Sequence, residues 1–240
     1  MKRIVELYDL GRMPYSKAWE LQKETQRILV DQKRFADKKI SEDEYINDQF
    51  YLTEHPHVYT IGKSGDKSNM LKNISELSLI EAEYVETDRG GDITYHGPGQ
   101  IVGYPIIDLE EYFTDIHRYL RYLEEVIIQT CSEFDIYGTR IKGLTGVWVK
   151  DEKICAMGLR CSRWVTMHGF ALNVNTDLSY FDHIIPCGIE GKNVTSLEKI
   201  IGEKIDPDKV KNILLNKFSD VFDVDIQRKN KHPKWDKELL

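Results

Sequence analysis

Three extended runs late in the chain constrain the fold more than any other feature. GVWVK (146–150), KICAMGLR (153–160) and VTMHGFALNVN (165–175) are rich in strand-forming residues, and only short breaks separate them. They predict a β-meander. Four earlier segments also have strand patterns: Arg3 to Leu10, QFYLTEH, HVYTIG and IVGYPIIDL. The chain therefore needs a sizeable sheet.

Much of the chain outside these strands has the residue spacing of helices. Apolar residues recur at helical intervals from Tyr15 to about Asp37 and from Ile116 to Phe134. Thr195 and Glu198 form a possible capping box for a short helix, and Pro207 can begin a last one that runs to about Val221. Strands and helices in this order predict an α/β (α+β) fold, with one mixed β-sheet flanked by helices rather than a doubly wound sheet.

Composition limits the class of protein. With 41% apolar residues and no long apolar run, residues 1–240 are expected to form a single soluble domain without a membrane span or signal peptide, located in the cytoplasm. The 40 acidic and 33 basic residues give a net charge of −7, which argues against nucleic acid as a partner. No GxGxxG or GxxxxGK[ST] motif is present, so nucleotide binding is not indicated.

The four cysteines differ in their sequence context. Cys131 lies on the apolar stripe of a predicted helix and is expected in the core. Cys155 falls within a strand, where alternation points it the same way as Lys153. Cys187 lies between Pro186 and Gly188 in an irregular segment, where a nucleophile could be presented, although most loop cysteines have no such role.

A cysteine attacks as its thiolate and needs a nearby base or cation. His96, His168, His183 and Lys153 are the candidates, although a lysine in a strand is more often simply exposed. His55 and His57 flank Pro56, but no third metal ligand accompanies them, so no metal site is predicted.

The stretch RGGDITYHGPGQ (89–100) contains four glycines and one proline. Such a segment permits close backbone approach, or it is no more than a tight turn. The residues alone leave both interpretations open.

Five segments in order nevertheless resemble one family. RGGDITYHGPGQIVGYPIIDL, together with EHPHVYTIGKSG, GVWVKDEKICAMGLR, HGFALNVNTDL and IIPCGI, is similar to the lipoyl(octanoyl) transferase family, the octanoyltransferases of protein lipoylation. The matching segments span about Glu54 to Ile189, more than half of the chain.

The resemblance implies a fold similar to that of the biotin and lipoate protein ligases. It also implies an acyltransferase that needs no ATP, metal or other cofactor. An octanoyl group would leave the pantetheine thiol of octanoyl-acyl carrier protein, form a thioester on an enzyme cysteine, and pass to a lysine of a lipoyl domain. The family's acceptors are the apo lipoyl domains of 2-oxoacid dehydrogenase E2 subunits and the H protein of glycine cleavage.

The resemblance also implies roles for individual residues. The family's cysteine falls on Cys187 and its partner lysine on Lys153. Its acyl-binding segments fall on Arg89, Gly90, Gly91, Asp92, Ile93, Thr94, Tyr95 and His96, on Ala156, Met157 and Gly158, and on Gly169, Phe170 and Ala171. A saturated acyl chain needs an apolar slot with close walls, which glycines would permit.

Two other functions remain open. An ATP-dependent lipoate or octanoate ligase would have the same fold but no use for the cysteine, and a non-catalytic acyl-binding module would keep only the slot. For either transfer partner, an acidic surface could dock on a basic patch formed by Arg118, Arg121, Arg140 and Lys142.

Overall fold

The centre of the protein is a seven-stranded sheet. The computed structural model describes residues 2–35, 45–185 and 193–230. β10 and β2 pair parallel to β1, and the other neighbours are antiparallel, which confirms the predicted mixed sheet. The strand order is β10 (Val224–Arg228), β1 (Arg3–Arg12), β2 (Asp48–Glu54), β6 (Gln100–Ile106), β9 (Val165–Asn173), β8 (Glu152–Ser162) and β7 (Val147–Val149).

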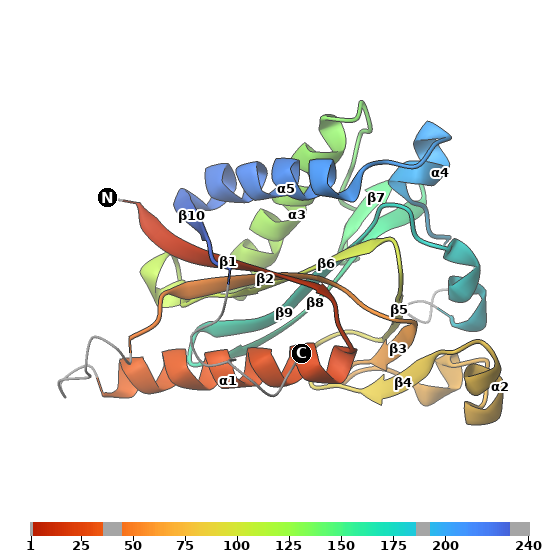
Figure 1. Ribbon diagram of the computed structural model, residues 1–240, viewed down its shortest axis with the longest axis horizontal. Coiled ribbons are helices and arrows are strands. Elements are labelled where there is room, and N and C mark those ends of the chain that lie inside the picture. Colours follow the sequence, from red (N-terminus) through yellow and green to blue (C-terminus); the bar gives the residue numbers. More distant parts are fainter. Residues whose placement is uncertain (1, 36–44, 186–192, 231–240) are drawn as a thin grey trace.

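Helices cover both faces of this sheet. α1 (Tyr15–Arg34) lies below it in Figure 1, whereas α3 (Ile116–Ser132) and α5 (Pro207–Phe222) lie above. Asp115 caps α3 by accepting from two backbone N–H groups of the first turn, and Pro207 begins α5 behind its capping residue Asp206. The predicted long helices are therefore present at nearly the predicted bounds.

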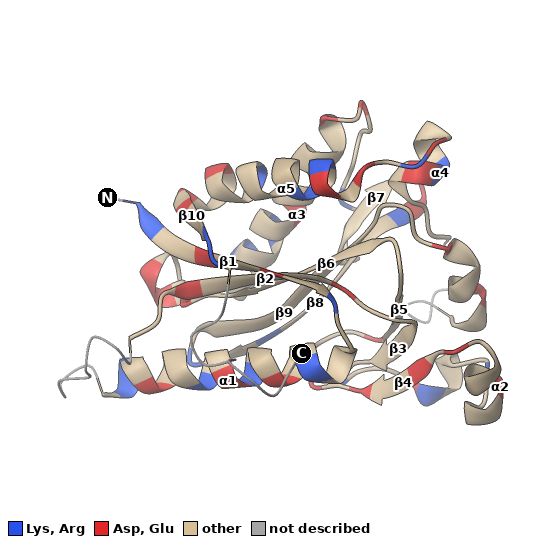
Figure 2. Cartoon of the chain, viewed as in Figure 1, with Lys and Arg blue, Asp and Glu red and all other residues tan. Residues whose placement is uncertain are grey.

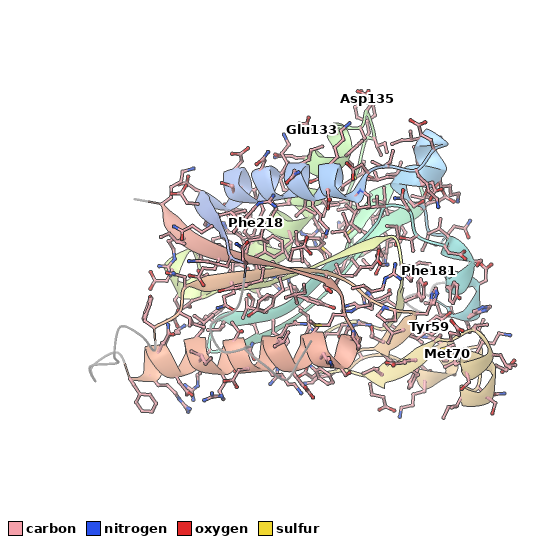
Figure 3. All side chains as sticks on the ribbon, viewed as in Figure 1. Tyr59, Met70, Glu133, Asp135, Phe181 and Phe218 are labelled. Carbon is pink, nitrogen blue, oxygen red and sulfur yellow. The ribbon has the colours of Figure 1, made fainter. Side chains whose placement is uncertain are left out.

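Two apolar clusters hold the layers together. One fills the space between the sheet and the α3–α5 pair and includes Phe218, labelled in Figure 3. The other packs α1 against the opposite face. Each fully buried large apolar side chain contributes on the order of 1.5–3 kcal/mol through removal from water, so these clusters provide most of the driving force for this arrangement.

A smaller three-stranded sheet stands beside the large one. Its strands are β4 (Glu83–Glu86), β3 (Val58–Ile61) and β5 (Ile93–His96), with β3 in the middle. Tyr59, Met70 and Phe181 pack together between this sheet and two short helical turns, as Figure 3 shows. The neighbouring short elements are η2 (Lys67–Asn69), α2 (Ile74–Leu79) and η4 (Leu178–His183); η3 (Leu109–Glu111) and α4 (Leu197–Ile201) lie elsewhere.

Some local predictions need correction. Ser196, not Thr195, caps α4, because its side chain accepts from the backbone N–H of Lys199. Half of the glycine-rich stretch is a turn, but residues 93–96 form β5. The predicted apolar stripe of α3 is not buried along its whole length: Leu123, Ile127 and Cys131 are fully buried, whereas Ile116 and Leu120 are only partly buried.

Charged residues lie mainly on the outer surfaces. Both signs alternate along α1 in Figure 2, while the central strands carry little charge. Within the described ranges, no helix combines the length and apolar character needed to cross a membrane.

Two of the four residues of the predicted basic patch are neutralised by their own neighbours. Arg121 and Arg140 both form ion pairs with Glu124, which is completely buried, and Arg140 also pairs with Glu125. Glu124 in turn accepts from the backbone N–H of Gly146 at 3.1 Å. These arginines therefore compensate a buried carboxylate, and the surface has less uncompensated positive charge than the sequence indicates.

Candidate active site

A cavity of about 570 Å³ lies between the small sheet and the β8–β9 end of the large sheet. Among the residues lining it are Lys153 and all of the predicted acyl-site residues except Tyr95: Arg89, Gly90, Gly91, Asp92, Ile93, Thr94, His96, Ala156, Met157, Gly158, Gly169, Phe170 and Ala171. The fold thus brings three segments that are distant in sequence to one cavity. Its volume is in the ordinary range for a small-molecule site.

Tyr95 has a different environment. Its side chain is fully buried, its ring packs against Tyr59, Tyr180 and Phe181, and its hydroxyl lies 2.7 Å from His57 Nδ1. It belongs to the apolar cluster of the small sheet and is not among the lining residues. Alternation along β5 turns Tyr95 away from the cavity that Thr94 and His96 line, whereas Ile93, on the same face as Tyr95, still lines the cavity at the start of the strand.

The glycines bring the Arg89–Asp92 loop close to both sheets. The backbone N–H of Gly90 donates to the carbonyl of Leu159 on β8 at 2.8 Å. A Cβ on Gly158 would lie 2.8 Å from the Gly90 carbonyl oxygen, and one on Gly62 only 2.2 Å from that of Gly91. Gly91 itself has φ +90°, a conformation that side chains disfavour. These positions require glycine because the backbones touch.

Arg89 fixes this loop from the inside. Its guanidinium, 7% exposed, donates to the carbonyl of Thr60 at 2.6 Å and to the Thr60 hydroxyl at 3.0 Å. The loop's other end is held by Asp92, whose carboxylate accepts from Asn69 Nδ2 at 2.7 Å and from the Asp66 N–H. One wall of the cavity is therefore held at both ends by charged side chains.

A chain of buried hydrogen bonds runs beneath the cavity and defines the tautomer of His96. Gln100 Nε2 donates to Asn173 Oδ1 at 2.9 Å, so Gln100 Oε1 is the acceptor for His96 Nδ1–H at 2.9 Å. His96 Nε2 is left to accept from the Thr60 hydroxyl at 3.3 Å. Burial and the nearby His55 hold the pKa of His96 well below its usual value, so this imidazole is neutral.

A second polar group closes another part of the cavity. His168, which is almost completely buried, has φ +63°, and its backbone N–H donates to Gln22 of α1. Its Nε2 lies 2.8 Å from Asp88, which also forms an ion pair with Arg160. Burial keeps the pKa of His168 below its usual value despite the carboxylate, so His168 donates to Asp88 as a neutral ring.

Lys153 is held on both sides by its backbone. Its N–H donates to the carbonyl of Asn193 at 2.9 Å, and its carbonyl accepts from the Thr195 N–H at 3.0 Å. Lys153 is one of the lining residues, and its Nζ lies 4.8 Å from the centre of the Trp148 ring.

Cys187 lies outside the described residues. The described segments on either side of it in sequence are both anchored near the cavity: Ile185 donates its N–H to the Asn69 carbonyl at 2.9 Å, and Asn193 accepts from Lys153. Phe181 and Val194, close to these two anchors, line the cavity.

The other cysteines are poor nucleophiles in this structure. Cys131 and Cys155 are fully buried in the core beneath α3, as predicted for Cys131, and burial raises the pKa of Cys131 to about 12 and that of Cys155 well above its usual value. The expectation that Cys155 faces the same way as Lys153 is wrong. A register shift in the β7–β8 ladder pairs Lys153 with Trp148 but Cys155 with Val147, so their side chains leave opposite faces.

Comparisons with known proteins agree with this architecture. The family model described as "Lipoyl protein ligase A/B catalytic domain" matches residues 18–219. A protein named octanoyltransferase from Flavobacterium psychrophilum is 52% identical over 93% of this chain and 98% of its own length. One of the same name from Bacteroides thetaiotaomicron is 45% identical over 87% of this chain and 91% of its own length. The chain belongs to the octanoyltransferase family.

Solved structures with much lower sequence identity have a similar fold. A bi-partite lipoate protein ligase from Thermoplasma acidophilum superimposes with a TM-score of 0.69 at 14% identity, covering 98% of this chain and 89% of that one. A lipoate-protein ligase A bound with ATP gives a TM-score of 0.68 at 13% identity, covering 98% and 91%. At such low identity the likeness concerns the fold alone, and it confirms the predicted similarity to lipoate ligases.

Several lining residues of the cavity were missed by sequence reasoning. Gln100 and Tyr104 lie inside a matched segment, and the two-residue period of β6 could have placed them on one face. Tyr15, Ile116, Leu120, Leu144, Phe181 and Val194 also line the cavity. No motif distinguishes them, because ordinary apolar periodicity predicts a core residue and a cavity-lining residue equally well.

The buried histidines predict a pH-dependent stability. Burial lowers the pKa of His55 to about 4, and His96 and His168 are shifted in the same direction. In the unfolded chain each histidine would titrate near pH 6.5. The stability that the neutral buried rings contribute is therefore fully present above about pH 6.5, and it is lost as the pH falls toward the pKa values of the folded state. Asp48 acts oppositely, because burial raises its pKa to about 6 and the native state gains relative stability below that pH.

We therefore expect the free energy of unfolding to fall between about pH 7 and pH 5, by up to about 1.4 kcal/mol per pH unit for each histidine. Urea denaturation at several pH values measures this slope. His55→Gln should reduce the slope, because one titrating group is removed; a slope that is unchanged in this variant would contradict the assignment.

Proposed function

We propose that this chain transfers an octanoyl group from the pantetheine thiol of an acyl carrier protein to a lysine of a lipoyl domain, through a thioester on Cys187. The observation that carries the proposal is the position of Lys153, which reaches a cavity whose walls include all three predicted acyl-binding segments. The high identity to proteins named octanoyltransferase supports the same reaction.

The first half-reaction would form the acyl-enzyme. The Cys187 thiolate attacks the thioester carbonyl, the bond from that carbon to the pantetheine sulfur breaks, and the Lys153 ammonium donates its proton to the departing sulfur. The products are the octanoyl thioester of Cys187 and the free carrier thiol. The acyl chain would lie along the wall that includes Ala156, Gly158 and Gly169.

The second half-reaction would transfer the octanoyl group from Cys187 to the acceptor lysine. The acceptor lysine first loses a proton to solvent, and its neutral amine attacks the thioester carbonyl. The attacking nitrogen then carries one proton more than an amide nitrogen, and this proton passes to neutral Lys153 as the Cys187 thiolate leaves. An amide replaces the thioester. Because the thioester already provides the activation, we expect no ATP, metal or other cofactor to be needed. Among the described residues, no group of histidine, cysteine and carboxylate side chains is arranged to hold a metal ion.

The partners and location follow from the same proposal. The acceptors are lipoyl domains of 2-oxoacid dehydrogenase E2 subunits and the H protein of glycine cleavage, and the site of action is the cytoplasm. Neither nucleic acid nor a membrane takes part.

The test is intact-mass spectrometry of the enzyme mixed with octanoyl-acyl carrier protein, with and without ATP. We expect the mass of one octanoyl group to be added without ATP, and to be absent in Cys187→Ser. Cys161→Ser is the matched control, since Cys161 is half-buried at the far end of β8 and is not a lining residue. An absolute requirement for ATP would identify a ligase instead, and an adduct mapped to Cys155 would reject Cys187 as the nucleophile.

A further inference from the structure

The end of the Lys153 side chain lies over an aromatic face. Nζ is 4.8 Å from the centre of the Trp148 ring, within the range of about 6 Å in which a cation is attracted by the ring's negative face. Lys153 and Trp148 are directly opposed in the β7–β8 ladder, so the contact is set by strand register. The position of Nζ over the ring therefore follows from the pairing of the two residues and not from a chance rotamer of an exposed lysine.

Trp148 is a fixed platform. The residue is 2% exposed and is one of the largest buried side chains of the protein. Its backbone exchanges two hydrogen bonds with Thr139, at 2.7 and 2.9 Å, outside the main ladder. Val147 and Trp148 are adjacent in β7, so strand alternation sends their side chains to opposite faces, Val147 into the core and Trp148 toward Lys153.

An aromatic face does not treat the two protonation states of a lysine equally. It attracts the ammonium and has little attraction for the neutral amine. Resting on the proposed function, the two half-reactions change the charge of Lys153 in opposite directions: the ammonium loses its proton when the acyl-enzyme forms, and the neutral amine gains a proton when the acyl-enzyme is discharged.

We propose that Trp148 is a positioning residue for Lys153, which holds Nζ over its ring, stabilises the ammonium and so favours discharge of the acyl-enzyme over its formation. The ring opposes the first half-reaction, in which the ammonium gives its proton to the departing sulfur. It assists the later step, in which the same nitrogen gains a proton and becomes a cation. Trp148 thereby sets which half-reaction limits the overall rate.

Single-turnover measurements of each half-reaction test this. In Trp148→Leu, discharge of preformed acyl-enzyme to a lipoyl domain should slow about three- to thirty-fold, whereas acyl-enzyme formation should be unchanged or faster. Trp148→Phe keeps a weaker aromatic face and should restore part of the discharge rate. Trp164→Leu, at the exposed β8–β9 turn, is the matched control and should change neither rate.

The competing outcomes are distinct. Equal slowing of both half-reactions, or equal rates for the Phe and Leu variants, would overturn the inference and leave Trp148 a structural residue. Melting temperatures of all variants separate a loss of folding from a change in rate. If the wild-type protein formed no acyl-enzyme at all, the proposed function would fail first, before any comparison of the variants.

Discussion

Lys153→Ala is expected to reduce octanoyl transfer by about 10²–10⁴-fold, the usual contribution of a positioned acid–base group. Both half-reactions should slow, because the same nitrogen protonates the carrier thiol in one and accepts the amine proton in the other. Lys153→Arg should separate the two functions. Arginine keeps the cation but does not deprotonate near neutral pH, so some acyl-enzyme should form and its discharge should nearly stop.

Rapid-quench mass spectrometry of each half-reaction provides the measurement. Lys199→Ala is the matched control, since Lys199 is a nearby lysine whose Nζ pairs with Glu152 at 2.8 Å and does not line the cavity. The control should retain the wild-type rates. A Lys153→Ala enzyme with wild-type discharge would show that some other group accepts the amine proton.

Gly169→Ala is expected to destabilise the protein by about 3 kcal/mol or more. A Cβ at this position would lie 2.1 Å from the carbonyl oxygen of Gly103 on the neighbouring strand, and backbone cannot move aside as a side chain can. The β6–β9 pair would have to separate, in the middle of the sheet and at the wall of the cavity. Chemical denaturation measures the loss.

Ala171→Gly provides the comparison on the same strand. This change removes one methyl group and should cost only about 1 kcal/mol, mainly through backbone entropy. If Gly169→Ala were no more destabilising than Ala171→Gly, the close approach of β6 and β9 described above would be wrong.

The elements that could be predicted from sequence are those whose own residues carry the signal. The α3 stripe and the three late strands were placed correctly because apolar period and turn residues are local properties. β10 was not anticipated, since five residues with one strongly buried side chain, Val224, carry almost no pattern; its partner β1 lies at the opposite end of the chain.

The candidate site divides in the same way. Sequence resemblance indicated the lining segments, but periodicity misplaced Cys155, because alternation assumes an unbroken ladder and the register shift beside Trp148 breaks it. The commitment of Arg140 to the buried Glu124 could not be foreseen either, because 16 residues separate the two and their meeting depends on packing that no short window of sequence contains. The Arg121–Glu124 pair, by contrast, is a local i,i+3 contact on α3.

The parallel pairing of β1 with β10 has a consequence for biosynthesis. Val5 pairs with Ile226, so β1 finds one of its two neighbours only after all the other strands described here have been made. Such distant pairing raises the contact order and slows folding, and one edge of β1 stays open meanwhile to other chains. Expression at reduced translation rate should therefore prolong the period in which nascent chains are prone to aggregate, and newly made protein should depend on chaperones more than its compact final form suggests.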